Sequence, residues 1–271
     1  MEKIKRNVRI ALLSRMLASS PGKLFSLSQC AEEMGCAKSS LSEDIAILKD
    51  IFTLHGLGKI ETLIGTQGGI IYHPELSPQG VEELVEQLCQ LVNHPERVLP
   101  GGFLYLTDLV GNPELMSRVG LFFAQLFRDL NLDAILTVET KGIPIAMMTA
   151  RMLGLPLVIV RNDSRISEGT SIGISYLSGT QKRLVTMSLP KRALAKNSRL
   201  VFIDDFLRRG GTAHGILDLV AEFESVCLGM GFLIDIAGED KLVQRYFSLL
   251  TLEMLDSEAR RLIVSKGRHQ L

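Results

Sequence analysis

The sequence predicts an α/β protein with a small N-terminal domain of helices and a β-hairpin and a larger C-terminal domain built on a mainly parallel sheet. Amphipathic helical patterns dominate the N-terminal part, whereas short apolar runs alternate with helical segments from Leu132 onward. Such alternation is typical of a parallel sheet covered by helices. Between the two regions, residues 73–80 include two prolines and a glycine, which are boundary signals. We therefore predict domains at 1–74 and 75–271.

The composition is that of an ordinary globular protein. Its 271 residues are 46% hydrophobic and 22% charged, which excludes disordered and collagen-like chains. The four cysteines show no CxxC or Cys/His ligand spacing, so we expect no zinc site, no disulfide framework and a reducing, cytoplasmic location. The N-terminus has no signal-peptide pattern, and the longest nearly uncharged run, 142–160, contains Arg151 and two prolines. We therefore expect no membrane partner.

Basic residues are concentrated in two stretches, although 30 Lys and Arg balance 30 Asp and Glu over the chain. Residues 1–30 contain six basic side chains and one acidic side chain, and residues 161–211 contain ten basic and four acidic side chains. A chain of zero net charge can therefore carry two cationic surfaces, one in each domain.

The first predicted element is an amphipathic helix that ends at the Ser-Ser-Pro-Gly segment. Its polar face is cationic, because the basic residues of the first stretch lie between the apolar ones. The residues at helical spacing that we expect on its apolar face are Ile4, Val8, Leu12, Leu13 and Met16.

Two further helices joined by a tight turn follow. Ser26 and Gln29 have capping-box spacing and begin a short helix that runs through Met34. Gly35 makes the turn, and a third helix runs from about 37 to 51. This arrangement is typical of a helix-turn-helix, in which the first turn of the second helix enters the major groove of DNA.

A β-hairpin after the third helix completes a DNA-binding pattern. Residues 59–63 and 70–72 are predicted to be two strands around a glycine-bearing turn, at the position of a wing. A small helical domain that binds protein is the alternative, and the wing and the basic first helix favour duplex DNA. Glu43 and Asp44 are expected to face the protein or to bind a base donor. The residues that we expect to contact DNA are Lys5, Arg6, Arg9, Lys38, Ser39, Ser40, Ser42, Thr66 and Gln67.

The most informative motif is 200–212, in which four apolar residues precede two aspartates and a loop that ends in Gly-Gly-Thr. Gly210 and Gly211 allow backbone N–H groups to approach a phosphate, and the following helix N-terminus adds its dipole. Asp204 and Asp205 can accept hydrogen bonds from ribose hydroxyls or hold Mg²⁺ through oxygen ligands. The alternative is a strand that simply ends in two solvated aspartates, and the glycine loop at this distance argues against it.

This run resembles the phosphoribosyl pyrophosphate (PRPP) signature of type I phosphoribosyltransferases. The resemblance implies a type I phosphoribosyltransferase-like domain that binds PRPP, with Mg²⁺ at Asp204 and Asp205. By the same resemblance, 137–144 looks like the loop that holds pyrophosphate, and Arg161 begins the basic stretch where the family has a mobile loop. The residues that it implies for effector binding are Glu139, Thr140, Lys141, Gly142, Arg161, Asp204, Asp205, Phe206, Leu207, Arg208, Arg209, Gly210, Gly211 and Thr212.

A winged helix joined to a PRPP-binding domain resembles the purine operon repressors of Gram-positive bacteria over essentially the whole chain. The resemblance implies a homodimeric repressor of purine biosynthesis and transport genes, without catalytic residues, that leaves double-stranded operator DNA when PRPP binds. It implies guanosine tetraphosphate more weakly, as a competing ligand of the same pocket. The alternatives are an active purine phosphoribosyltransferase with an appended DNA-binding domain and a protein with both activities. Arg208 and Arg209 replace the small residues that are common in the enzymes, which favours a sensor.

Overall fold

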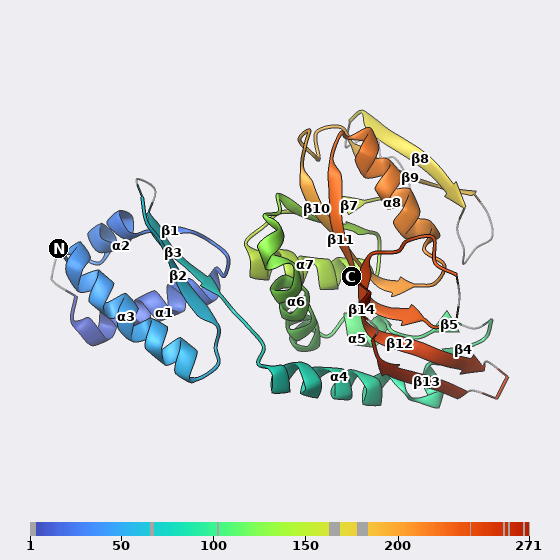
Figure 1. Ribbon diagram of the computed structural model, residues 1–271, viewed down its shortest axis with the longest axis horizontal. Helices are drawn as coiled ribbons and strands as arrows, with labels where there is room; N and C mark the ends of the chain where they lie inside the picture. The colour runs from blue at the N-terminus through green and yellow to red at the C-terminus, as the bar shows by residue number, and fades with distance from the viewer. Residues whose placement is uncertain are drawn as a thin grey trace. The chain divides into compact units, whose positions relative to one another are not determined.

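The computed structural model describes residues 4–65, 68–101, 103–162, 169–177, 184–238, 240–256, 258–259, 261–267 and 269–270 (Figure 1). Two compact units are present: Met1–Pro78 with Arg151–Leu155, and Gln79–Ala150 with Pro156–Leu271. The boundary predicted after residue 74 lies four residues before Pro78. No helix among these residues is long and apolar enough to cross a membrane.

The first unit contains three helices and a three-stranded antiparallel sheet. The helices are α1 (Arg6–Ser19), α2 (Leu27–Glu33) and α3 (Lys38–Leu54), and the strands pair in the order β1 (Phe25–Ser26), β3 (Gly69–His73) and β2 (Lys59–Leu63). The Ser26 side chain accepts a hydrogen bond from the Gln29 backbone N–H at 3.5 Å, which caps α2. The three predicted helices and the predicted hairpin are therefore confirmed, and β1 is an addition.

The buried face of α1 differs from the predicted one. Leu13 is fully buried and Arg9 is only 7% exposed. Val8 and Leu12, which were predicted to be apolar core positions, are 45% and 44% exposed. Arg9 is drawn inside because Asp44 of α3, itself fully buried, accepts its hydrogen bond at 2.8 Å. Arg9 shares the buried face of α1 with Leu13 and Leu17, and its guanidinium neutralises the buried carboxylate.

The second unit begins with helical and short strand segments. These are α4 (Pro78–Val92), η1 (Pro95–Arg97), the pair β4 (Val98–Leu99) and β5 (Phe103–Leu104), α5 (Thr107–Val110), α6 (Pro113–Phe127) and η2 (Arg128–Leu130). An alternation of strands and helices follows: β6 (Ala134–Val138), α7 (Gly142–Leu153), β7 (Leu157–Val160), the antiparallel hairpin β8 (Ser171–Leu177) and β9 (Leu184–Pro190), β10 (Arg199–Leu207) and α8 (Gly211–Glu222). The chain ends with β11 (Val226–Ile236), β12 (Tyr246–Asp256), β13 (Arg261–Lys266) and β14 (His269–Gln270).

The main sheet of this unit has the order β13-β12-β11-β10-β6-β7, with β14 paired to β12. The five strands from β12 to β7 run parallel, and β13 and β14 are antiparallel to β12. All five residues of β6 are buried, as expected for a central parallel strand covered on both faces. The predicted mainly parallel α/β sheet is thus confirmed.

Strands β6 and β10 lie side by side at the centre of this sheet, and their pairing is parallel with Phe202 opposite Leu136. Phe202 also packs edge-on against Phe232 of β11, with ring centroids 5.8 Å apart. Because parallel neighbours end at the same edge, the loops after β6 and β10 emerge together. This places the two loops that were singled out in the sequence next to each other.

Candidate functional site

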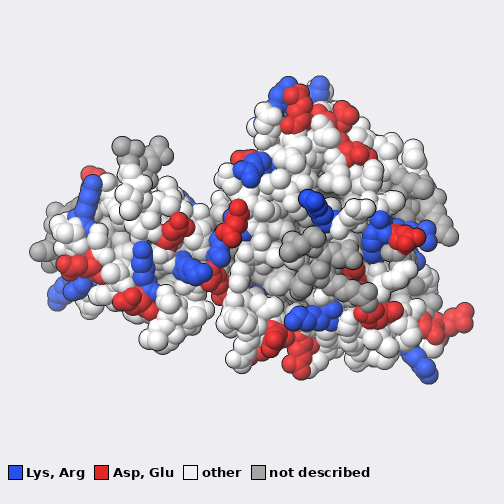
Figure 2. Space-filling view, viewed as in Figure 1, with Lys and Arg blue, Asp and Glu red and all other residues white. Residues whose placement is uncertain are grey.

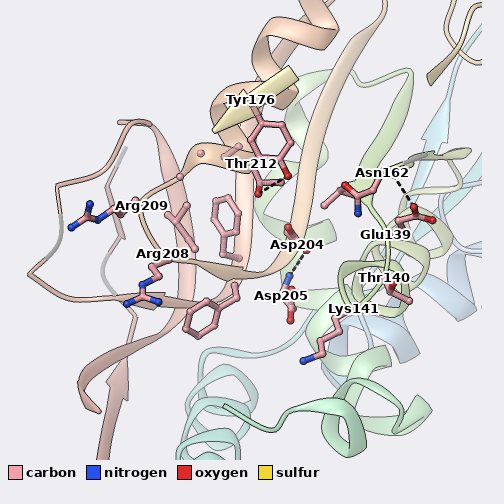
Figure 3. A pocket seen from close by; sticks show the side chains of 17 residues that line it. Glu139, Thr140, Lys141, Asn162, Tyr176, Asp204, Asp205, Arg208, Arg209 and Thr212 are labelled. Atoms are coloured by element: carbon pink, nitrogen blue, oxygen red, sulfur yellow. Dashed lines mark hydrogen bonds between the residues drawn. The ribbon is translucent and has the colours of Figure 1, made fainter. Parts of the chain in front are cut away.

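A cavity of about 400 Å³ opens where β6 and β10 end (Figure 3). Twelve of the fourteen residues predicted to bind the effector line it, and the two that do not are Gly142 and Arg161. Five lining residues were not predicted: Val138, Asn162, Tyr176, Ala213 and Phe232. The structure therefore brings the two predicted loops into one site. The role of each residue in ligand binding remains a prediction.

Asp204 and Asp205 lie at the end of β10. The Asp205 backbone N–H donates a hydrogen bond to Asp204 Oδ1 at 2.9 Å. Burial raises the pKa of the Asp204 carboxyl well above its usual range, and the Asp205 carboxylate adds to this effect. Burial also raises the pKa of Asp205, opposed by the hydrogen bond to Asp204 and by the Lys141 ammonium. The pKa of each carboxyl is raised in spite of Lys141 and the nearby backbone N–H groups, so a ligand or cation that adds positive charge or hydrogen-bond donors would be favoured here.

The loop after Asp205 ends at the N-terminus of α8. Gly210 has φ 83°, a left-handed conformation that favours glycine, and it occupies the N-cap position of this twelve-residue helix. The first N–H groups of such a helix have no intrahelical acceptor, and its dipole favours an anion. In Figure 3 the side chains of Arg208 and Arg209 extend away from Asp204 and Asp205. The backbone of this loop is thus its candidate anion-binding element.

The loop after β6 packs closely against Asp204. A Cβ atom on Gly142 would lie 2.5 Å from Asp204 Oδ1 and 2.6 Å from Thr137 Oγ1, so this position requires glycine. Thr137 Oγ1 is buried and has no hydrogen-bond partner among the described residues. Gly142 therefore acts by allowing close packing beneath the cavity, and Lys141 brings its ammonium group beside Asp205.

Arg161 lies beside the cavity rather than in its lining. Its Nη1 atom is 3.6 Å from Glu139 Oε2, and its backbone pairs with Ser188. Glu139 Oε1 also accepts a hydrogen bond from the Asn162 backbone N–H at 2.7 Å. These contacts hold Glu139, which lines the cavity, to the end of β7. Three further basic residues of the stretch 161–211, at positions 165, 182 and 183, lie outside the described residues.

Tyr176 comes from β8 and contributes a wall of the cavity. The Thr212 hydroxyl donates a hydrogen bond to the Tyr176 hydroxyl at 3.4 Å, and the ring packs against Gly215 of α8, where a Cβ atom would lie 3.1 Å from Tyr176 Cγ. The hairpin β8–β9 is therefore in contact with the phosphate loop (Figure 3). No local motif marks this tyrosine in the sequence.

The predicted DNA contacts of the first unit differ in their exposure to solvent. Lys5, Lys38, Ser39 and Ser42 are exposed and Ser40 is half-buried. Thr66 and Gln67, at the wing turn, lie outside the described residues. Figure 2 shows basic and acidic side chains interspersed on the visible face of this unit. The exposed residues at the start of α3 are available to a groove, and their contact with DNA remains a prediction.

Arg6 and Arg9 converge on one buried carboxylate. Arg9 Nε donates to Asp44 Oδ2 at 2.8 Å, and Arg6 Nε donates to Asp44 Oδ1 at 3.0 Å. Arg9 also donates to the Ile4 carbonyl at 2.9 Å. Arg6 keeps an exposed side and reaches Glu43 at 3.3 Å. Arg9 is committed to the interior, so little of its surface remains for the phosphate contact that the sequence suggested.

Comparison with known proteins identifies both units. The family model described as "Bacterial purine repressor, N-terminal" matches residues 5–74, and the model described as "Phosphoribosyl transferase domain" matches residues 106–257. A yeast structure, the adenine phosphoribosyltransferase of Saccharomyces cerevisiae, superimposes with a TM-score of 0.53 at 22% identity, covering 62% of this chain and 98% of that chain. The structural likeness shows the phosphoribosyltransferase fold.

Relatives with assigned names match the chain over its length. The "Purine biosynthesis transcriptional repressor PurR" of Bacillus subtilis is 40% identical over 98% of this chain and 93% of its own length. The "Purine biosynthesis transcriptional activator PurR" of Lactococcus lactis is 33% identical over 97% of this chain and 98% of its own. The "Xanthine phosphoribosyltransferase" of Lactobacillus delbrueckii is 31% identical, over 62% of this chain and 93% of its own. With a DNA-binding unit and a phosphoribosyltransferase fold joined as in its full-length relatives, the chain belongs to the family of bacterial purine repressors.

Proposed function

We propose that this protein is a DNA-binding transcriptional repressor of purine biosynthesis and transport genes that leaves its operator when PRPP binds the second unit. The full-length relative of B. subtilis is named a repressor, and the relative of L. lactis is named an activator at lower identity. Binding to an operator can repress or activate transcription, according to where the operator lies relative to the promoter. We propose repression because the repressor is the more similar of the two relatives. We also propose that it acts as a homodimer.

The observation that carries the proposal is the presence of a phosphate loop and of the Asp204 and Asp205 carboxyl groups in one cavity. PRPP offers a phosphate, vicinal hydroxyls and a pyrophosphate. The loop 208–212 would hold the phosphate through backbone N–H groups, and Asp204 and Asp205 would accept hydrogen bonds from the hydroxyls. Lys141 and the loop 139–142 would hold the pyrophosphate.

The carboxylates also fit a Mg²⁺ ion, which prefers oxygen ligands and would supply the missing positive charge. The described residues contain no group of three or more His, Cys, Asp or Glu side chains able to hold a metal. The proposed ion would therefore bind together with PRPP rather than alone. Guanosine tetraphosphate offers two pyrophosphate groups to the same loops, and we propose it as a competing ligand.

Release of DNA by PRPP requires that PRPP bind the DNA-free form more tightly than the DNA-bound form. By thermodynamic reciprocity, DNA must weaken PRPP binding by the same factor. Tenfold relief needs about 1.4 kcal/mol of coupling, which is within the usual range for allostery.

A second candidate is an active purine phosphoribosyltransferase with an appended DNA-binding unit. The relative named xanthine phosphoribosyltransferase supports it. Against it, the full-length relatives are named regulators, and two arginines replace the small residues expected in the phosphate loop of the enzymes.

The test is binding to DNA from a purine-gene control region, followed by fluorescence anisotropy with and without PRPP and Mg²⁺. The same sample is then assayed for pyrophosphate release with a panel of nucleobases. We expect PRPP to release DNA and to remain intact. Pyrophosphate release without any effect on DNA would contradict the proposal and support the enzyme.

A further inference from the structure

The segment 241–243 lies directly behind the phosphate loop. Lys241 Nζ donates hydrogen bonds to the carbonyl oxygens of Arg208 at 2.6 Å and Leu207 at 3.5 Å. The Leu242 backbone N–H donates to the Arg209 carbonyl at 2.9 Å. Three successive carbonyl groups of the loop, at 207, 208 and 209, are therefore held by two successive residues of another segment.

The orientation of these carbonyls fixes the orientation of the N–H groups. In a planar trans peptide, the N–H of each residue points opposite to the carbonyl of the residue before it. The N–H groups of Arg208, Arg209 and Gly210 therefore point away from the segment 241–243. The described residues that line the cavity include 207–212 and none of the three residues 241–243. The loop thus separates the segment from the cavity, and the three N–H groups face the cavity side.

A row of N–H groups on one side of a loop is an anion-binding concavity. Its geometry depends on holding the carbonyls on the other side, because free carbonyls would rotate to meet water. An ammonium group suits this task, since it offers three donors and no acceptor. Lys241 Nζ also donates to the Ile236 carbonyl at 2.5 Å at the end of β11, which ties the loop to the sheet. The segment 241–243 also packs against Gly210, where a Cβ atom would lie 3.2 Å from Val243 Cγ2.

We propose that Lys241 is a positioning residue for effector binding: it holds the carbonyls of the loop 207–209 so that the following N–H groups face the effector phosphate. Lys241 lies outside the cavity lining and acts through the loop backbone. This inference rests on the proposed function, because it takes PRPP as the ligand of the cavity.

The experiment compares the full-length wild-type protein with Lys241→Met by calorimetric titration with PRPP and Mg²⁺. Loss of charge-assisted hydrogen bonds to the loop is expected to weaken PRPP binding roughly ten- to hundredfold. Operator affinity without PRPP is expected to stay within about twofold, and saturating PRPP still releases the DNA. Lys241→Arg keeps the charge and the donors, and is expected to recover most of the affinity. Lys241→Gln keeps two N–H donors without the charge and should fall between them, and it serves if the Met variant does not fold.

The matched control is Lys196→Met. Lys196 pairs with Glu224 on the surface at 2.6 Å, so this change removes the same charge from the same unit without touching the loop. Equal PRPP affinity in wild type and Lys241→Met, or equal losses in Lys241→Met and Lys196→Met, would overturn the inference. If the wild-type protein itself fails to bind PRPP, the proposed function is overturned and the inference falls with it.

Discussion

Two buried aspartate side chains, Asp44 in the first unit and Asp204 in the second unit, have opposite surroundings. In the first unit, Asp44 is fully buried between Arg6 and Arg9, at 3.0 and 2.8 Å. In the second unit, Asp204 and Asp205 lie at a cavity, and burial raises the pKa of both. A carboxylate paired with two guanidinium groups inside the protein serves packing, whereas a carboxyl group whose pKa is raised by burial at the wall of a cavity is a candidate for ligand binding. The surroundings of a charge, rather than its presence in the sequence, separate structure from function here.

The largest effect, on the free energy of unfolding, is expected from breaking the cluster of Arg6, Arg9 and Asp44. Asp44→Ala would leave the buried Arg9 guanidinium without its carboxylate, which costs about 3–5 kcal/mol for a buried pair. Urea unfolding followed by a signal from the first unit measures the free energy of unfolding. The matched control is Glu43→Ala, which removes an exposed ion pair worth about 0–1 kcal/mol. Equal losses in the two variants would show that Asp44 is not the stabilising centre of this unit.

A smaller effect, on the free energy of PRPP binding, is expected from changing the pair Asp204 and Asp205. Asp205→Ala removes an acceptor for ribose hydroxyls or Mg²⁺, and should weaken PRPP binding by about 1.5–3 kcal/mol, the value of hydrogen bonds to charged groups. DNA binding without PRPP should be unchanged. Calorimetry with PRPP and operator anisotropy measure the two affinities. Loss of DNA binding itself would contradict the division of labour between the units.

The raised pKa of Asp204 predicts a pH dependence of stability. Between the unfolded pKa and the raised folded pKa, the folded state holds a proton that the unfolded state has lost. Stability of the second unit therefore falls as pH rises through this window, by up to about 1.4 kcal/mol per pH unit. Asp204→Asn removes one of the two carboxyl groups with a raised pKa and should reduce the slope, while Asp205 keeps its own contribution. Chemical unfolding at a series of pH values measures the slope, and identical slopes in wild type and variant would contradict this reading.

The smallest effect is expected at the DNA surface. If Lys38 meets a phosphate, Lys38→Ala should reduce the slope of log affinity against log salt by about 0.9. Operator titrations at several salt concentrations give the slope, with Lys266→Ala in β13 as the control. A slope that does not change would remove Lys38 from the interface.

The elements with strong local signals were predictable from the sequence. Strands β6 (134–138) and β7 (157–160) lie in the stretch from Leu132 onward where alternating strands and helices are predicted, because short, mostly apolar runs are typical of buried parallel strands. The phosphate loop was predictable because all its parts are contiguous. Twelve of the predicted effector residues accordingly line one cavity.

The remainder depends on contacts between distant segments. Tyr176 and Phe232 reach the cavity from β8 and β11, and no spacing rule connects them to 200–212. Lys241 acts on the loop from more than thirty positions away. Arg9 lies four residues before Leu13 and so shares its face of α1, but only the partner Asp44 explains why a charged residue is accepted there. Sequence patterns locate elements, whereas pairing of charges across the fold requires the structure.

If PRPP and operator DNA oppose each other as proposed, the two units are coupled. The most direct measurement is the PRPP affinity of the full-length protein, free and saturated with operator DNA, in the presence of Mg²⁺. Coupling of the two units predicts weaker PRPP binding on DNA, by the same factor by which PRPP weakens DNA binding. Equal PRPP affinities in the free and DNA-bound protein would contradict it.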